Sequence, residues 1–217
     1  LLAKVAALQP DSALAQTRLA AGLIAAGQGG VGVEHLRKAL ELDPRFTQAD
    51  VLLVMNHLQK REFPQAIEAA QDFQRRNPES ATPFNLLGRV YLATNRTAEA
   101  RQAFVKALEL EPGDPGASQS LAAFAVQEKD YAGARRYYEG VLAKHPDYLP
   151  AQMQLAALDF TEGHADAMAE RLKKIIAAHP DAVEPRLVLA RYHLERREVS
   201  ETLAVLNELD ETQKKLP

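Results

Sequence analysis

The sequence predicts an all-α solenoid of antiparallel helix pairs, and three observations lead to this fold class. A proline recurs every 34 residues, a leucine recurs with the same period, and a small residue directly follows that leucine. A fixed period of this length indicates a helix–turn–helix unit that stacks on copies of itself, because one pair of helices cannot bury its apolar side alone.

The prolines set the boundaries of the units. Six of the 12 prolines carry the period: Pro10, Pro44, Pro78, Pro112, Pro146 and Pro180. The residue before a proline disfavours the α conformation, so each of these prolines is expected to end a second helix. With the proline at position 32, we expect one continuous domain made of a partial unit and six whole ones. The segments are 1–12, 13–46, 47–80, 81–114, 115–148, 149–182 and 183–217, the last including the start of a continuation.

Two further positions test this division. Position 7 is a leucine in every unit: Leu19, Leu53, Leu87, Leu121, Leu155 and Leu189. Position 8, where the two helices of a unit approach closely, is small: Ala20, Val54, Gly88, Ala122, Ala156 and Ala190. Apolar residues also recur at the three-and-four spacing of amphipathic helices.

The third unit carries the residues of a known repeat. Its sequence places Phe84, Leu87, Gly88, Tyr91, Ala100, Phe104 and Pro112 at the spacing of the pattern W-x2-L-G-x2-Y…A-x3-F…P, with phenylalanine in the place of tryptophan. The chain therefore resembles the tetratricopeptide-repeat family over its whole length. The resemblance implies a right-handed superhelical solenoid of six repeats preceded by a partial N-terminal helix, and a role in binding proteins.

The ends and one glycine-rich turn give further expectations. Leu1 falls at position 23 of a preceding repeat, and neither end offers a polar cap, so we expect the chain to be part of a longer array. Apolar faces without caps leave self-association through the ends open. Because Gly29, Gly30 and Gly32 weaken a helix, the second helix of the first repeat is expected to begin late, near Val33.

The composition argues against several classes of function. The chain has 26 basic and 29 acidic residues and no cysteine, so there is no basic excess for nucleic acid and no thiolate metal site. No apolar run reaches the roughly 20 residues that cross a bilayer, so this segment is not expected to insert into a membrane. No nucleophile, paired-histidine or phosphate-loop motif occurs. We therefore expect no enzyme activity, no metal and no cofactor.

Position 11 holds polar residues where packing is expected. Equal positions of consecutive repeats are neighbours in a stacked array, so Asp159 and His193 are expected to meet, as are His57 and Tyr91. A buried carboxylate is costly unless it is paired. We interpret Asp159 and His193 as a structural polar pair rather than as a proton-handling or metal site.

The resemblance also implies where a partner binds. In this family the first helices line an inner groove, which corresponds to positions 2, 5, 6, 9, 12 and 13. The expected groove residues are Arg18, Val51, Leu52, Met55, Asn85, Leu86, Arg89, Gln119, Ser120, Met153, Gln154, Leu187 and Arg191. Apolar side chains with adaptable methionines suit a helix or an extended segment of a protein partner, and arginines suit its carboxylates.

Three hypotheses for the function follow. The first is a non-catalytic scaffold that binds a protein or peptide segment. The regular, alanine-rich repeats are similar in texture to bacterial lipoproteins associated with exosortase/PEP-CTERM sorting, which implies a periplasmic, lipid-anchored parent acting in exopolysaccharide production or export. A cytoplasmic location stays open. The alternatives are a regulatory sensor with one deep pocket for a peptide or small ligand, and a substrate-recruiting arm of a multidomain enzyme.

Overall fold

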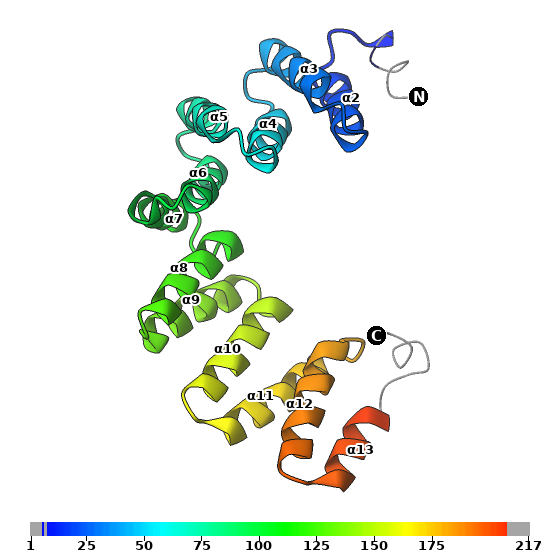
Figure 1. The fold of residues 1–217 in the computed structure, drawn as a ribbon, viewed down its shortest axis with the longest axis vertical. Coiled ribbons are helices and arrows are strands. Elements are labelled where there is room, and N and C mark those ends of the chain that lie inside the picture. The colour runs from blue at the N-terminus through cyan, green and yellow to red at the C-terminus, as the bar shows by residue number, and fades with distance from the viewer. Residues whose placement is uncertain (1–5, 7, 208–217) are drawn as a thin grey trace. The chain divides into compact units, whose positions relative to one another are not determined.

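The structure is a computed structural model that describes residue 6 and residues 8–207, so half of segment 1–12 and the end of the sixth repeat lie outside the described residues. Over the described part the secondary structure is entirely α-helical (Figure 1). The helices are α2 (Ala13–Ala25), α3 (Gly29–Leu42), α4 (Thr47–Gln59), α5 (Phe63–Arg76), α6 (Ala81–Ala93), α7 (Thr97–Leu110), α8 (Pro115–Gln127), α9 (Tyr131–Lys144), α10 (Leu149–Thr161), α11 (Ala165–Ala178), α12 (Val183–Glu195) and α13 (Val199–Asn207). The predicted all-α solenoid of helix pairs is confirmed.

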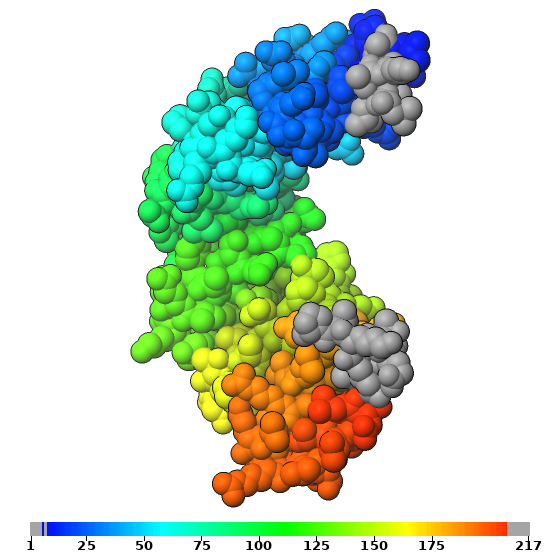
Figure 2. Space-filling model, turned by 45° about the vertical axis from the view of Figure 1, so that its right-hand side comes forward, coloured from blue at the N-terminus to red at the C-terminus, as the bar shows by residue number. Residues whose placement is uncertain are grey.

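The chain divides into two compact units, residues 1–117 and 118–217. In the first unit, α2, α4 and α6 lie along one side and α3, α5 and α7 along the other (Figure 1). In the second unit, α10 packs on α9 and α11, and α12 packs on α11 and α13. The space-filling view shows the successive pairs within each unit in direct contact (Figure 2). That all six repeats form one domain stays a prediction.

The leucines and small residues of the repeat lie where the helices of a pair meet. From the second repeat on, the leucine at position 7 is buried in every repeat, and Leu19 is half-buried. Gly88 shows why position 8 is small: a Cβ atom there would lie 2.6 Å from the ring of Phe104. The pair α6–α7 closes tightly because the ring occupies the space that a side chain at position 88 would need.

Every first helix ends in the same turn. The N–H of position 16 donates to the carbonyl of position 11 over 2.8 to 2.9 Å in all six repeats, as from Glu62 to His57. Position 15 has a positive φ in each repeat, from 59° at Arg61 to 82° at Gly163. This is the Schellman end of a helix, which satisfies free carbonyls and requires a left-handed residue. In the third repeat this residue is Asn95, with φ 59°.

The expected late start of the helix near Val33 is wrong, because α3 begins at Gly29. The reason is tertiary. A Cβ atom on Gly29 would lie 2.8 Å from Asn56 of α4, and one on Gly32 would lie 2.7 Å from Ile24 of α2. These glycines let α3 pack closely on both neighbours, and the packing outweighs their low helix propensity.

Candidate partner-binding site

Two hollows lie between the first helices α4 and α6 of the first unit. One is at the N-terminal ends of these helices, has a volume of about 610 Å³, and is lined by Thr47, Gln48, Val51, Leu52, Ser80 and Thr82. The other is at their C-terminal ends, has a volume of about 460 Å³, and is lined by Leu58, Gln59, Arg61, Phe63, Arg89, Leu92 and Ala93. The first helices thus present hollows at both ends of one face, which is the face that the repeat pattern predicts for a partner.

The predicted groove residues of α4 and α6 differ in how much surface they offer. Val51, Leu52 and Met55 are half-buried, and each packs against an apolar core cluster with part of its side chain. Arg89 is exposed. Leu86 is only 4% exposed and belongs to the core that also holds Phe73 and Val90. The assignment of Leu86 to the accessible groove is therefore corrected: it supports the face from beneath.

Asn85 has a structural partner. Its amide Nδ2 donates to Oδ1 of Asp114 over 2.9 Å, and the same oxygen accepts from the backbone N–H of Ala117 over 2.7 Å. Asp114 thereby caps the first turn of α8, and Asn85 holds that carboxylate in place. The donor atom of Asn85 is committed to this contact, so the structure gives it a role in joining repeats.

The remaining predicted residues are spread over other helices. Arg18 is exposed on α2, Gln119 is exposed on α8, and Ser120 is half-buried there. In the second unit Met153 is half-buried against the core, whereas Gln154 and Leu187 are exposed. The side chain of Leu187 is among the exposed large apolar groups, at 49%.

A hollow of about 240 Å³ between α10 and α12 has part of the same construction in the second unit. Its lining is Phe160, Met168, Val188, Arg191, Tyr192 and Glu195. Position 12 of one repeat and positions 9 and 13 of the next line both this hollow and that of α4 and α6 at their C-terminal ends. Arginine stands at position 9 in both, as Arg191 and Arg89. In the second unit Glu195 accepts from Arg191 over 2.9 Å, so this charge is balanced.

Sequence reasoning missed Arg61 and Phe63, which line the hollow although they lie outside the first helices. The expected groove positions all lie in first helices, whereas these two residues belong to the turn and the start of α5. For Arg61 the signal was the turn itself, because position 15 follows the helix end and a long side chain there reaches the hollow beside the next repeat.

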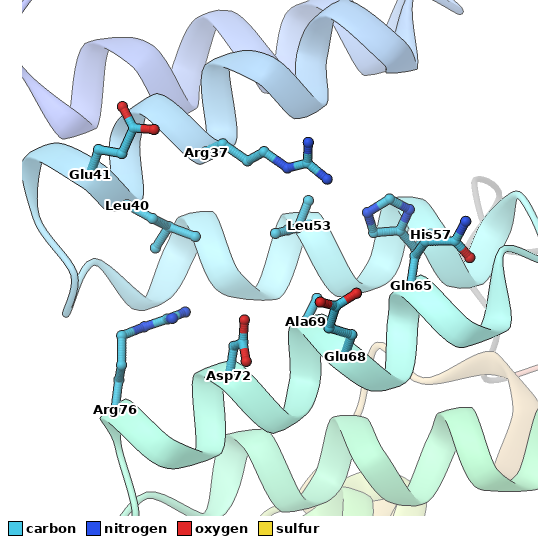
Figure 3. A pocket seen from close by; sticks show the side chains of 10 residues that line it. All are labelled: Arg37, Leu40, Glu41, Leu53, His57, Gln65, Glu68, Ala69, Asp72 and Arg76. Atoms are coloured by element: carbon cyan, nitrogen blue, oxygen red, sulfur yellow. The ribbon is translucent and has the colours of Figure 1, made fainter.

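A further hollow of about 450 Å³ opens on the side of the second helices, between α3 and α5, and α4 forms its floor. Figure 3 shows Arg37 of α3 across from Glu68 and Asp72 of α5, with Arg76 at one end. Arg76 forms an ion pair with the buried Asp50, and Asp72 one with Arg75. The charges of this hollow largely offset one another, so it gives little selectivity for a charged partner.

The predicted pair of Asp159 and His193 is not the pairing that the structure shows. Asp159 accepts from Arg135 over 2.9 Å and from Arg171 over 2.6 Å. His193 lies 2.6 Å from Glu198, and His57 likewise lies 2.6 Å from Glu62. For the two histidines the cause is the Schellman turn, which brings position 16 back over position 11 of its own repeat. Asp159 is instead paired with Arg171 of its own repeat and with Arg135 of the preceding one.

Two buried aspartates have opposite electrostatic environments. Burial raises the pKa of Asp159, but hydrogen bonds and charge from Arg171 and Arg135 outweigh burial and hold the pKa below its usual range. At Asp50 burial prevails over Arg76 and raises the pKa. Among the described residues, Arg76 is the one arginine that contacts Asp50, and Oδ2 of Asp50 has no hydrogen-bond partner. The sequence did not single out Asp50, because nothing in the repeat pattern marks position 4.

Groups that could hold a metal ion require three or more clustered ligands. Among residue 6 and residues 8–207 no such cluster of His, Asp or Glu side chains occurs. In the same part of the chain, no helix has the length and apolar character needed to cross a membrane.

Comparison with known proteins agrees with the repeat. Residues 51–115 match the tetratricopeptide-repeat family. The type IV pilus assembly protein PilF of Pseudomonas aeruginosa is 31% identical over 147 residues, which are 64% of this chain and 56% of that protein. Cellulose synthase operon protein C of Pseudomonas fluorescens is 36% identical over 85 residues, which are 39% of this chain and 6% of that protein. The chain thus matches little more than half of one relative and a small part of the other.

A solved structure of Pseudomonas aeruginosa PilF has the same fold. It superposes with a TM-score of 0.68 at 20% identity and covers 89% of this chain and 88% of that structure. The family match and the structural likeness together support the tetratricopeptide-repeat assignment. Tetratricopeptide-repeat proteins generally mediate interactions between proteins.

Proposed function

We propose that this chain is a non-catalytic scaffold that holds a segment of a partner protein along the face formed by α4 and α6. The observation that carries the proposal is the pair of hollows at the two ends of this face. Val51 lines one of them and Met55 lies between them on α4, each with part of its side chain accessible. An apolar strip with a hollow at either end suits an extended or helical segment that anchors a side chain in each hollow.

The dimensions of the face fix the length of such a segment. Helix α4 has 13 residues, which at 1.5 Å per residue gives a length of about 20 Å. An extended chain covers this distance with about six residues. A segment of six to eight residues is therefore the shortest partner that reaches both hollows.

The alternative of a small-ligand sensor predicts one deep, dominant pocket. Several separate hollows on different faces favour the binding of a segment instead. The third hypothesis, a substrate-recruiting arm of an enzyme, uses the same face and differs only in what the rest of the protein does.

The test is affinity capture from the native cell lysate with this chain and with a Met55→Glu, Arg89→Glu variant. Circular dichroism shows whether both are equally folded. A Lys38→Glu, Arg45→Glu variant, which changes two exposed basic residues away from the hollows between α4 and α6, is the control. A protein captured by the chain and by the control, but lost with the first variant, supports the proposal. Equal capture by all three contradicts it.

We further propose that the parent protein acts in the production or export of an exopolysaccharide, as a lipid-anchored periplasmic protein. The similarity to a cellulose synthase operon protein supports this role. The longer match to a type IV pilus assembly protein favours pilus assembly as a second candidate. Deleting the gene in the native organism and measuring secreted polysaccharide, surface pili and the fraction that contains the protein separates the two. Normal levels of secreted polysaccharide and of surface pili would contradict both proposed roles.

A further inference from the structure

The hollow at the C-terminal ends of α4 and α6 carries two arginines without balancing acids. Arg61 and Arg89 are both exposed and both line the hollow. Neither guanidinium has an ion-pair partner among the residues that the structure describes, and the lining includes no acidic side chain. The nearest acid along the chain, Glu62, is held by His57 at 2.6 Å.

Two other arginines near such helix ends are neutralised. Arg191, which has the position of Arg89 in the sixth repeat, is paired with Glu195 at 2.9 Å. Arg96, in the turn that follows α6, is paired with Glu99 at 3.0 Å. Among the described residues, the hollow between α4 and α6 therefore has two unpaired cations, and this distinguishes it from the hollow between α10 and α12 in the second unit.

The helix ends weaken the positive potential but do not cancel it. Each of α4 and α6 directs its C-terminal end here, which contributes about half a negative charge per helix. The turn N–H groups of Arg61 and Glu62 already satisfy carbonyls of α4 at 3.1 and 2.9 Å. Two full positive charges remain larger than two partly satisfied dipole ends, so the hollow favours an anion.

Apart from Gln59, the rest of the lining is apolar. Leu58 and Phe63 are half-buried, and Leu92 is 38% exposed. A ligand with only an anionic group would leave these apolar side chains exposed to water. The combination suits a carboxylate side chain next to a leucine or an aromatic residue, since both chemistries are then matched.

We infer that this hollow binds an aspartate or glutamate of the partner segment, with an apolar residue beside it in sequence. The inference rests on the proposed function and adds the direction in which the segment lies on the face: the acidic end lies over Arg61 and Arg89. The other end lies in the uncharged hollow whose hydroxyl groups come from Thr47, Ser80 and Thr82.

The test uses a phage-displayed library of random nine-residue peptides selected on the whole chain. The expected consensus contains Asp or Glu adjacent to Leu, Ile, Phe or Tyr. Fluorescence anisotropy then gives the affinity of a selected peptide for the chain and for an Arg61→Gln, Arg89→Gln variant. Because exposed charge pairs are individually weak and the variant removes two of them, it is expected to bind roughly tenfold more weakly. Replacing the peptide's acid with its amide gives the same loss.

Two further variants decide the interpretation. Lys38→Gln, Arg45→Gln removes the same charge from exposed sites elsewhere in the first unit, and its affinity is expected to stay within twofold. Arg61→Glu, Arg89→Glu is expected to select peptides with Lys or Arg in place of the acid.

The outcomes that contradict the inference are distinct from those that contradict the proposed function. Peptides without an acid, whose binding is lost with Met55→Glu but unchanged with Arg61→Gln, Arg89→Gln, overturn the inference alone. A selection that yields no binder, or binders indifferent to Met55→Glu in a folded chain, overturns both.

Discussion

The Nδ1 atom of His57 lies 2.6 Å from a carboxylate oxygen of Glu62, and the same contact recurs between His193 and Glu198 at 2.6 Å. In the third repeat the equivalent residues are also in contact, with the guanidinium of Arg96 4.5 Å from the ring centre of Tyr91. In the second, third and sixth repeats, positions 11 and 16 are therefore a side-chain pair as well as a backbone pair, and each such pair fixes the turn between the helices of its own repeat.

Removing one member of this pair is expected to weaken the repeat. Glu62→Ala leaves the ring nitrogen of the buried His57 without its partner, and a lost hydrogen bond of this kind costs about 1 kcal/mol of unfolding free energy. Urea unfolding followed by circular dichroism measures the change. Glu68→Ala, which removes an exposed carboxylate of α5, is the control and should leave the midpoint unchanged. Equal midpoints for both variants would show that the contact is not stabilising.

Lys129 holds a conformation that suits glycine. Its φ is 62°, and the equivalent residues Gly27 and Gly163 have φ 79° and 82°. A residue with a Cβ atom loses about 1 kcal/mol in this conformation, so Lys129→Gly is expected to raise the unfolding free energy by about that amount. Gly163→Ala is expected to lower it by a similar amount. Chemical denaturation checks both, and a destabilised Lys129→Gly variant contradicts the strain argument.

Two glycines within helices are expected to respond in opposite directions to alanine. Gly140 has nothing within 4 Å of an added Cβ atom, so Gly140→Ala gains helix propensity of about 1 kcal/mol. Gly88→Ala places its Cβ atom 2.6 Å from the buried ring of Phe104, and overpacking of this kind costs about 1 to 3 kcal/mol. Thermal unfolding of the two variants measures the difference. Adding Phe104→Leu to Gly88→Ala should relieve the overpacking. If the unfolding free-energy changes of the two substitutions simply add, the overpacking argument is contradicted.

Asp159 is expected to stabilise the second unit more at neutral than at acidic pH. Its folded pKa is lowered, so its contribution is present above the unfolded value of about 3.9 and is lost as the pH falls through the folded pKa. Asp159→Asn should cost about 3 kcal/mol at pH 7, because two arginines lose their anion, and less at low pH. Urea unfolding at several pH values measures this dependence. If the variant is as stable as the native chain at pH 7, the ion pairs contribute nothing.

Asp50 is the matched comparison, because the pH dependence of its contribution to stability has the opposite sign. Its folded pKa is raised, so its contribution is fully present below the unfolded value and is lost as the pH rises through the folded pKa. Asp50→Asn should therefore cost less at pH 7 than Asp159→Asn. Neither substitution touches the face of α4 and α6, so captured partners should be retained by both variants.

The repeat was readable from the sequence because its determinants are local. The ends of the second helices before the period prolines, the buried Leu87 and the small Gly88 each follow from a residue type that the backbone or the adjacent helix requires at one position. Such requirements recur in every repeat, so six copies reinforce one another, and the fold class could be predicted without coordinates.

The candidate site could be predicted only in part. The face of the first helices and Arg89 came from the repeat position, whereas Leu86 proved buried and Asn85 proved bound to Asp114. Whether a side chain at a groove position is accessible depends on how closely the next repeat packs. That distance is set by side chains far away in sequence, such as Asp114, which lies 29 positions from Asn85, and the pattern does not contain it.

The amino-acid sequence by itself therefore determined the helix pairs, their turns and the surface on which a partner is expected. Tertiary structure alone decided the start of α3 at Gly29, the two arginine partners of Asp159, and the meeting of Arg61 with Arg89 around one hollow. The physical reason is the separation in sequence over which each kind of interaction acts. Backbone conformation depends on neighbours a few residues away, whereas long charged side chains find their partners only after separate repeats have packed together.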